Sequence, residues 1–142
     1  MSIISARPSL AAVQSLLESA QLPTADLTAD HCEHFFYLGS PATPAGLVGL
    51  ELFGDVALLR SLAVTPADRA SGNGSALLEH AETYARSAGV KFLYLLTTTA
   101  EDFFARRGYT RTARDAAPPA ISTTREFAGI CPASSAFMSK PL

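Results

Sequence analysis

The sequence predicts one mixed α/β domain, formed by residues 1–142, in which helices flank a twisted and mostly antiparallel β-sheet. Two strand patterns, at residues 46–53 and 56–64, are separated by a Gly54-Asp55 hairpin signal. The strand–helix–strand order of residues 56–98 implies one right-handed parallel crossover. A chain of 142 residues, 48% of them hydrophobic, suffices for a single domain with a substantial core.

The first elements follow from apolar spacing and from breaker residues. Residues 2–6 form a short apolar run that predicts a strand. Pro8 suits the first turn of the helix expected over residues 10–20, whose apolar positions recur at helical spacing. Thr24 is expected to cap a second, short helix that ends near residue 30.

A meander of three strands is expected next. Residues 33–38 form its first strand, and a turn of prolines and small residues at 39–44 precedes the hairpin at 46–53 and 56–64. Pro66 should end the last of these strands, because proline cannot donate a hydrogen bond to the ladder.

The second half of the chain alternates helices and strands. Leu77, Ala81 and Tyr84 recur at the spacing of one helical face, which predicts a helix over residues 75–89 that stops at Gly89. The apolar run at residues 91–98 suits a strand at the sheet centre. The remaining expectations are a short helix at 100–107, a strand at 109–114, a break at 115–119, a short helix or ordered loop at 121–130 and a closing strand at 134–140.

Composition excludes several classes of protein. A formal net charge of −2 argues against non-specific nucleic-acid binding, and no apolar run reaches the roughly 18 residues of a membrane span. The first residues lack the basic and apolar regions of a signal peptide. A cytoplasmic protein, with Cys32 and Cys131 as free thiols, is therefore expected.

A glycine-containing turn joins the strand at 56–64 to the helix at 75–89. Gly72 and Gly74 carry no side chain, so a ligand can approach the backbone closely. The free amides and the dipole of the following helix favour a pyrophosphate, and Arg69 adds a cation. The alternative is an ordinary strand-to-helix turn. The Walker sequence and G-x-G-x-x-G are both missing.

The pattern Arg69-x-x-Gly72-x-Gly74, which follows a strand and a proline and precedes a helix, resembles the acetyl-CoA signature of the GNAT superfamily of N-acetyltransferases. A second segment, Phe103-Phe104-Ala105-Arg106-Arg107-Gly108-Tyr109, is similar to the F-Y-x-x-x-G-F segment of that family. The resemblance covers about residues 2 to 114. Three further segments, 94–100, 124–127 and 131–134, look like a subfamily found beside bacterial arsenic-resistance genes.

The resemblance implies a GNAT-like fold, splayed between its fourth and fifth strands, and acetyl-CoA as cosubstrate without a metal. The backbone of the fourth strand would hold the pantetheine and polarise the thioester. The residues implied in acetyl-CoA binding are Leu62, Ala63, Val64, Arg69, Ala70, Ser71, Gly72, Asn73, Gly74, Ser75, Phe103 and Phe104.

The acid and base of the reaction are not the usual ones. Phe104 stands where the family has a tyrosine that protonates the leaving thiolate, and phenylalanine donates no proton. Water, Tyr109 or Tyr94 could take that role. The best-placed carboxylate for a base is Glu51, whose alternative reading is a solvated strand residue.

Arginines point to an acidic group on the acceptor. Arg60 lies within an apolar strand, on the face expected to carry Leu58, Leu62 and Val64, so it needs a partner. That partner is either a substrate carboxylate or an internal carboxylate such as Glu51 or Glu126. We assign the acceptor site to Arg60, Thr97 and Arg125.

His31, Cys32 and His34 have a spacing that permits metal or arsenical binding, but no second ligand cluster accompanies them, and simple packing is the commoner role. We therefore expect no metal. The sequence predicts acetyl transfer to a primary amine on a small molecule, by direct attack, with a homodimer as one possible assembly. The rivals are a non-catalytic sensor of acyl-CoA or arsenicals and a protein N-acetyltransferase.

Overall fold

The computed structural model describes residues 4–22, 24–66, 72–130 and 135–142, and it contains one seven-stranded sheet of order β1-β2-β3-β4-β5-β7-β6. Every neighbouring pair is antiparallel except β4 and β5. The strands are β1 Ile4–Ala6, β2 Phe35–Gly39, β3 Pro44–Phe53, β4 Val56–Val64, β5 Phe92–Thr97, β6 Thr110–Arg111 and β7 Ala136–Pro141. The expected mixed fold with a mostly antiparallel sheet is confirmed.

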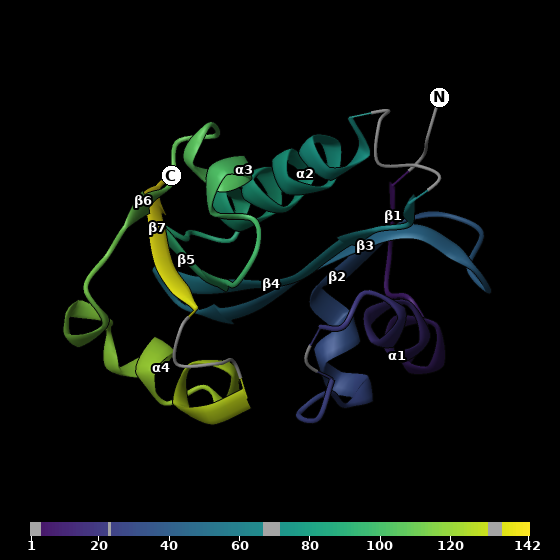
Figure 1. Ribbon diagram of the computed structural model, residues 1–142, viewed down its shortest axis with the longest axis horizontal. Coiled ribbons are helices and arrows are strands. Elements are labelled where there is room, and N and C mark those ends of the chain that lie inside the picture. Colours follow the sequence, from purple (N-terminus) through teal and green to yellow (C-terminus); the bar gives the residue numbers. More distant parts are fainter. Residues whose placement is uncertain (1–3, 23, 67–71, 131–134) are drawn as a thin grey trace.

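Helices cover both faces of the sheet. They are α1 Leu10–Ser19, η1 Ala29–His34, α2 Asn73–Ser87, α3 Glu101–Ala105, η3 Arg114–Ala116, α4 Pro119–Ser122 and the π-helical turn η4 Glu126–Ile130. In Figure 1, α2 and α3 lie above the sheet, and α1 and α4 lie below it. We call these sides the α2 face and the α1 face. None of the helices in the described part of the chain has both the length and the apolar character needed to cross a bilayer.

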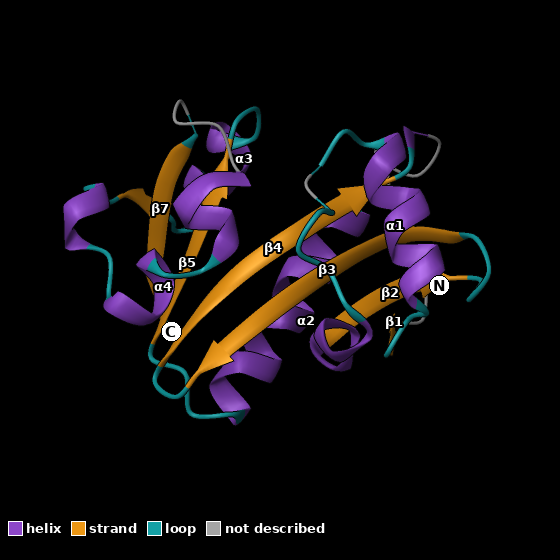
Figure 2. Ribbon diagram, turned by 90° about the horizontal axis from the view of Figure 1, so that it is seen from below, coloured by secondary structure: helices purple, strands orange, loops and turns teal. Residues whose placement is uncertain are grey.

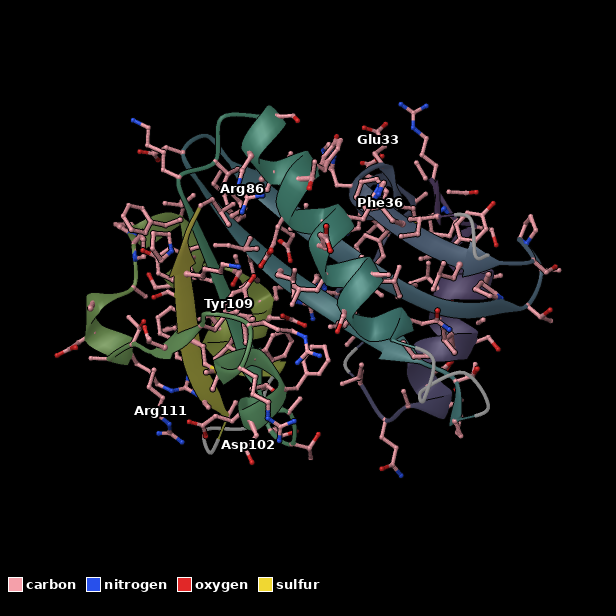
Figure 3. The ribbon with its side chains drawn as sticks, turned by 90° about the horizontal axis from the view of Figure 1, so that it is seen from above. Glu33, Phe36, Arg86, Asp102, Tyr109 and Arg111 are labelled. Atoms are coloured by element: carbon pink, nitrogen blue, oxygen red, sulfur yellow. The ribbon has the colours of Figure 1, made fainter. Side chains whose placement is uncertain are left out.

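Each face buries its own hydrophobic core. On the α2 face, Leu77, Leu78 and Ala81 of α2 pack against Val48 of β3 and Leu59 of β4. Figure 3 shows α2 crossing this face of the sheet. On the α1 face, Val13 and Leu17 pack with Phe35, Leu47 and Ala63. A third cluster on the same side joins Leu58 to Ile121 of α4 and Phe137 of β7.

The sheet opens between β4 and β5. These parallel strands pair only at their beginnings, from Val56 with Phe92 to Leu58 with Tyr94. Beyond Tyr94, β5 keeps its pairing with β7 up to Thr97. The separation of β4 from β5 is visible in Figure 2. The expected splay is confirmed, and it places the second half of β4 beside an opening.

A β-bulge at Ser61 changes the faces of β4. The pairing shifts from Gly49–Arg60 to Leu47–Ala63, and Ser61 adopts a positive φ of 63°. A bulge inserts one residue, so the side chains after it exchange faces. The expectation that Arg60 shares a face with Leu62 and Val64 is therefore wrong. Leu62 and Val64 pack on the α2 face, whereas Leu58 belongs to the cluster below the sheet with α4.

Two other expectations fail at element ends. The second helix is a 3₁₀ helix at Ala29–His34 rather than at residues 24–30, because the Thr28 amide donates to Nδ1 of His31 at 3.1 Å and closes a capping box there. The strand expected at 109–114 is reduced to Thr110–Arg111, and the amide of Thr112 then donates to Phe137. The segment at 121–130, left open between a short helix and a loop, lies mostly in α4 and η4.

Candidate active site

A cavity of about 740 Å³ occupies the opening between β4 and β5. Its walls come from five regions: the segment after α1, the second half of β4, the N-terminus of α2, the end of β5 with α3, and the C-terminal segment. The described residues that line it are Gln21, Leu22, Leu59, Arg60, Ser61, Leu62, Ala63, Val64, Gly72, Gly74, Ser75, Leu95, Leu96, Thr97, Thr98, Thr99, Ala100, Phe103, Phe104, Arg107, Glu126 and Ser135.

One end of the cavity is the N-terminus of α2. Gly72 is the N-cap residue, with a φ of 75° that favours glycine, and Gly74 and Ser75 line the wall. An added Cβ at Gly72 would meet no atom of the described residues within 4 Å. The 15-residue α2 therefore presents its first amides beside open space, an arrangement suited to an anion. Arg69, Ala70 and Ser71 lie outside the described residues, so their predicted role stays a prediction.

Arg107 supplies a cation next to this helix end. Its Nε and Nη2 atoms donate to Oγ of Ser75 at 3.0 and 2.6 Å, and its guanidinium lies 3.7 Å from the centre of the Phe103 ring. Stacking on the ring and the Ser75 hydroxyl fix the orientation of the guanidinium. Its position on the cavity wall was not predicted from the sequence.

The strand residues expected to contact the pantetheine line the cavity. Leu62, Ala63 and Val64 all border it, on the part of β4 that has separated from β5. Asn73 begins α2 and is absent from the described lining. The described strand and helix residues that the acetyl-CoA signature implied therefore line one cavity, apart from Asn73.

The aromatic residues of α3 form part of the core as well as the cavity wall. Phe104 is only 5% exposed and packs edge-on against Phe103 and Tyr109. The Tyr109 hydroxyl donates to Glu82 at 2.8 Å, and burial together with the Glu82 charge raises the pKa of Tyr109. Tyr94 stacks on Phe137, and burial and the Asp55 charge raise the pKa of Tyr94. Neither tyrosine is among the described lining residues, so both are poorly placed to protonate a leaving group there.

A buried charge cluster lies under β4. The Arg60 side chain is fully buried and makes a bidentate contact with Asp26, from Nη2 to Oδ1 at 2.8 Å and from Nη1 to Oδ2 at 2.5 Å. Nη1 also donates to Glu51 at 2.9 Å. Glu126 completes the cluster, with its Oε1 atom 3.4 Å from Nη2. Of the two partners considered for Arg60, the internal carboxylates are the ones observed.

The environment separates the pKa values of these acids. Burial acts to raise the pKa of Asp26, but the hydrogen bonds and charge of Arg60 outweigh it, so the pKa lies below its usual value. For Glu126, burial is the largest effect and raises the pKa, and the charges of Asp26 and Glu51 raise it further. The charge of Arg60 acts in the opposite direction but is outweighed, so the pKa of Glu126 is about 7. Arg60 itself has a raised pKa, because its carboxylate partners more than offset its burial.

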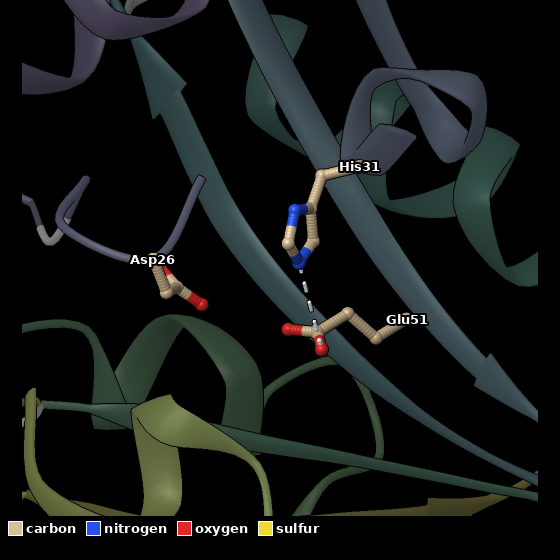
Figure 4. Close-up of side chains that lie close together, drawn as sticks. All are labelled: Asp26, His31 and Glu51. Carbon is tan, nitrogen blue, oxygen red and sulfur yellow. Dashed lines mark ion pairs between the residues drawn. The ribbon is translucent and has the colours of Figure 1, made fainter. Parts of the chain in front are cut away.

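Glu51 lies at the edge of this cluster. Its Oε1 atom is 4.0 Å from Nε2 of His31, the ion pair marked by a dashed line in Figure 4. Glu51 is not among the described residues that line the cavity. Asp26, His31 and Glu51 hold ligand atoms within 4.8 Å of one another. Both carboxylates already pair with the Arg60 guanidinium, which explains the grouping as an ion-pair network without a metal.

The residues of the H-C-x-H sequence diverge. Nδ1 of His31 accepts from the Thr28 amide, whereas His34 is 3.2 Å from the Tyr84 hydroxyl on α2. Cys32 is buried in the core of the α1 face. Because the three side chains have separate partners, their contacts favour a role in packing over a shared metal or arsenical site.

The other predicted acceptor residues have different placements. Thr97 lines the cavity, and its Oγ1 atom accepts from the Ala100 amide at 3.0 Å. Arg125 is exposed, lies outside the described lining and donates a long 3.5 Å contact to the Ala25 carbonyl. The structure therefore does not bring Arg125 and Arg60 together in the cavity.

Among the described residues, one buried side-chain oxygen in the cavity wall has no hydrogen-bond partner. The Ser135 hydroxyl is buried, lines the cavity and makes no hydrogen bond within the described residues. Such groups are rare in folded proteins, because burial without a partner is costly. A bound molecule in the cavity would supply that partner. No sequence pattern marked Ser135 or Asp26, since both depend on tertiary contacts.

The sequence model of the acetyltransferase (GNAT) family matches residues 7–112 of this chain. Curated relatives include an amino-acid acetyltransferase of Pseudomonas syringae pv. tomato, 39% identical over 69 residues, which are 49% of this chain and 16% of that protein. Another, from Pseudomonas fluorescens, is 41% identical over 73 residues, which are 51% of this chain and 17% of that protein. The chain thus spans about a sixth of the length of these relatives.

Solved structures share the fold. N-acetylglutamate synthase from Neisseria gonorrhoeae, complexed with coenzyme A and N-acetyl-glutamate, has a TM-score of 0.82 and 24% identity over 100% of this chain and 35% of that chain. A GNAT-family acetyltransferase from Staphylococcus aureus has a TM-score of 0.78 and 16% identity, with 100% and 99% coverage. With the match over residues 7–112, the conclusion is that this chain belongs to the acetyltransferase (GNAT) family.

Proposed function

We propose that the chain transfers an acetyl group from acetyl-CoA to the primary amine of a small, amino-acid-like molecule. The observation that carries this proposal is the cavity in the β4–β5 opening, which joins the N-terminus of α2 to a buried carboxylate cluster. Family membership and the amino-acid acetyltransferases among the relatives support it. The N-acetylglutamate synthase complex with coenzyme A supports the cosubstrate.

The cavity residues suit the two halves of the reaction. The first amides of α2, with Arg107 beside them, would bind the pyrophosphate, and the separated part of β4 would hold the pantetheine. Leu62 and Ala63 would then present backbone groups to the thioester carbonyl. The amine nitrogen forms a bond to the carbonyl carbon, the carbon–sulfur bond breaks, and the sulfur leaves as the thiolate of coenzyme A.

A coupled assay tests the proposal. Purified protein is incubated with acetyl-CoA and with single amino acids, their phosphorus and arsenic analogues, simple amines or lysine-containing peptides, and released free thiol is measured. We expect turnover with at least one small amine. Mass spectrometry should then show a product about 42 daltons heavier than the amine, because an acetyl group has replaced a hydrogen. Binding of acetyl-CoA without turnover of any acceptor would favour a sensor, and turnover of peptides alone would favour a protein acetyltransferase.

The narrower resemblance to the arsenic-resistance group stays a prediction, which the arsenic analogues in the same assay test directly. A cytoplasmic location and a homodimer also stay predictions. Size-exclusion chromatography with light scattering tests the dimer by the mass in solution.

A further inference from the structure

We propose that Glu126, which η4 places on the cavity wall, binds the ammonium group of the acceptor and removes its proton. This inference rests on the proposed acetyl transfer and names Glu126 as the base in place of Glu51, the candidate from the sequence. Glu126 is only 4% exposed, yet it is one of the residues that line the cavity. It also begins a π-helical turn, a rare geometry that is frequent at functional sites.

The contacts of Arg60 leave the Glu126 carboxylate available. The two terminal nitrogens of the guanidinium donate to Asp26, and one of them also donates to Glu51. Glu126 is the most distant of the three acids, at 3.4 Å, and it makes no other ion pair within the described residues. Its oxygens therefore keep capacity for a hydrogen-bond donor in the cavity.

The charge balance of the cluster favours a cation there. Three carboxylates, those of Asp26, Glu51 and Glu126, surround the single guanidinium of Arg60, and His31 is the one further basic group that forms an ion pair with them among the described residues. With the acids ionised, the site carries an excess of negative charge. An ammonium group beside Glu126 would neutralise part of that charge, whereas a second carboxylate would add to it.

Proton transfer from this position balances chemically. Glu126 accepts one proton from R–NH₃⁺, which leaves R–NH₂ with a lone pair for attack on the thioester carbon. After the C–N bond forms and the C–S bond breaks, the nitrogen loses a second proton, which goes to the thiolate to give the free thiol. Glu126 then returns its proton to water. A base is most effective when its pKa is near the working pH, and the pKa of Glu126 is about 7.

Glu51 provides a matched comparison. It is the same residue type, it contacts the same guanidinium, and it lies outside the described lining of the cavity. Glu126→Gln and Glu51→Gln each remove one negative charge from the cluster at nearly constant volume. A general electrostatic role would make the two variants alike, whereas proton transfer from the acceptor would separate them.

The experiment measures acceptor kcat/KM for both variants between pH 5.5 and 9, at saturating acetyl-CoA, with the best amine found in the acetylation assay. We expect Glu126→Gln to lower kcat/KM about 10²-fold or more at pH 7.5, the size typical of a lost acid–base group. The rise of wild-type activity through pH 7 should disappear, and high pH should recover part of the loss as free amine accumulates. Glu51→Gln should retain the rise. Glu126→Asp, which keeps a carboxylate, should recover more activity than Glu126→Gln.

Acetyl-CoA affinity, measured by calorimetry, should change less than about twofold in Glu126→Gln, and a retained circular dichroism spectrum shows that the variant folds. If wild type turns over an amine and Glu126→Gln keeps its rate and pH profile, this inference is wrong and the acetyltransferase proposal stands. If wild type acetylates no amine at all, the proposed function fails, and the assignment of the base fails with it.

Discussion

Arg60 contacts Asp26 and Glu126 unequally: both terminal nitrogens of the guanidinium donate hydrogen bonds to Asp26, whereas Glu126 lies 3.4 Å from Nη2. The two carboxylates therefore have different roles in the cluster. Asp26 neutralises the buried arginine, and Glu126 lines the cavity and has a raised pKa. Four predictions follow from the cluster and from the walls around it.

Removal of Arg60 should destabilise the protein strongly. Arg60→Ala leaves buried acids without their cation, and breaking a buried pair in this way costs about 3–5 kcal/mol. Urea denaturation at pH 7.5 measures the loss. Arg111→Ala is the control, because its pair with Glu101 is at the surface, where Arg111 points away from the sheet in Figure 3, and little change is expected. Similar midpoints for Arg60→Ala and wild type would show that the cluster contributes nothing to stability.

Stability should depend on pH through Glu126. Its pKa is raised from 4.5 to about 7 in the folded protein, so the folded state holds a proton that the unfolded state has lost between these values. Stability therefore falls as the pH rises through this window and levels off above it. The cost at pH 8 is on the order of 3 kcal/mol.

Glu126→Gln carries no titrating group, so it should lack this cost. Unfolding free energies of wild type and Glu126→Gln, measured by urea denaturation from pH 4 to 8, should diverge in favour of the variant as the pH rises. A constant difference across that range would mean that the Glu126 pKa is not raised.

The unpartnered hydroxyl of Ser135 should matter more for turnover than for folding. Ser135→Ala removes a buried group without a hydrogen bond, so the unfolding free energy should stay equal or rise by up to about 1 kcal/mol. If a bound molecule accepts from this hydroxyl, kcat/KM should fall about tenfold. Ser139→Ala, within β7, removes a hydroxyl that is hydrogen-bonded to the Thr112 hydroxyl, and it should reduce stability while sparing kinetics. Unchanged kinetics in Ser135→Ala would leave the hydroxyl without a role in binding.

A side chain at Gly74 should block acetyl-CoA. Among the described residues, an added Cβ would meet nothing closer than the Phe103 ring at 3.5 Å, so the fold should accept Gly74→Val, while the two extra methyl groups enter the cavity. Calorimetry should show at least a tenfold loss of affinity. Ala76→Val, on the exposed surface of the same helix, adds the same groups away from the cavity and should bind normally. Equal affinities in the two variants would remove α2 from the cosubstrate site.

Local patterns in the sequence determined the frame of this protein. Hydrophobic periodicity marked the helix at Asn73–Ser87, apolar runs marked the strands β4 and β5, and the Gly54 turn joined the hairpin, because these features depend on neighbours a few residues apart. The glycine signature likewise placed Gly72 and Gly74 at the start of α2, where the structure puts a cavity. The splay between β4 and β5 also followed from the family resemblance.

The tertiary structure decided which carboxylates complete the charge cluster. Arg60 was recognisable as a buried cation needing a partner, and Glu51 and Glu126 were candidates from the sequence, but Asp26, which comes from a loop 34 positions earlier, was not. The bulge at Ser61 then separated Arg60 from Leu62 and Val64, a change of face that strand alternation alone does not reveal. The carboxylate that borders the cavity is decided by how α1, η1 and the C-terminal segment pack around β4. The pKa of that carboxylate is also a tertiary property, because the energy of a buried charge is set by the groups around it in space and not by its neighbours in the chain.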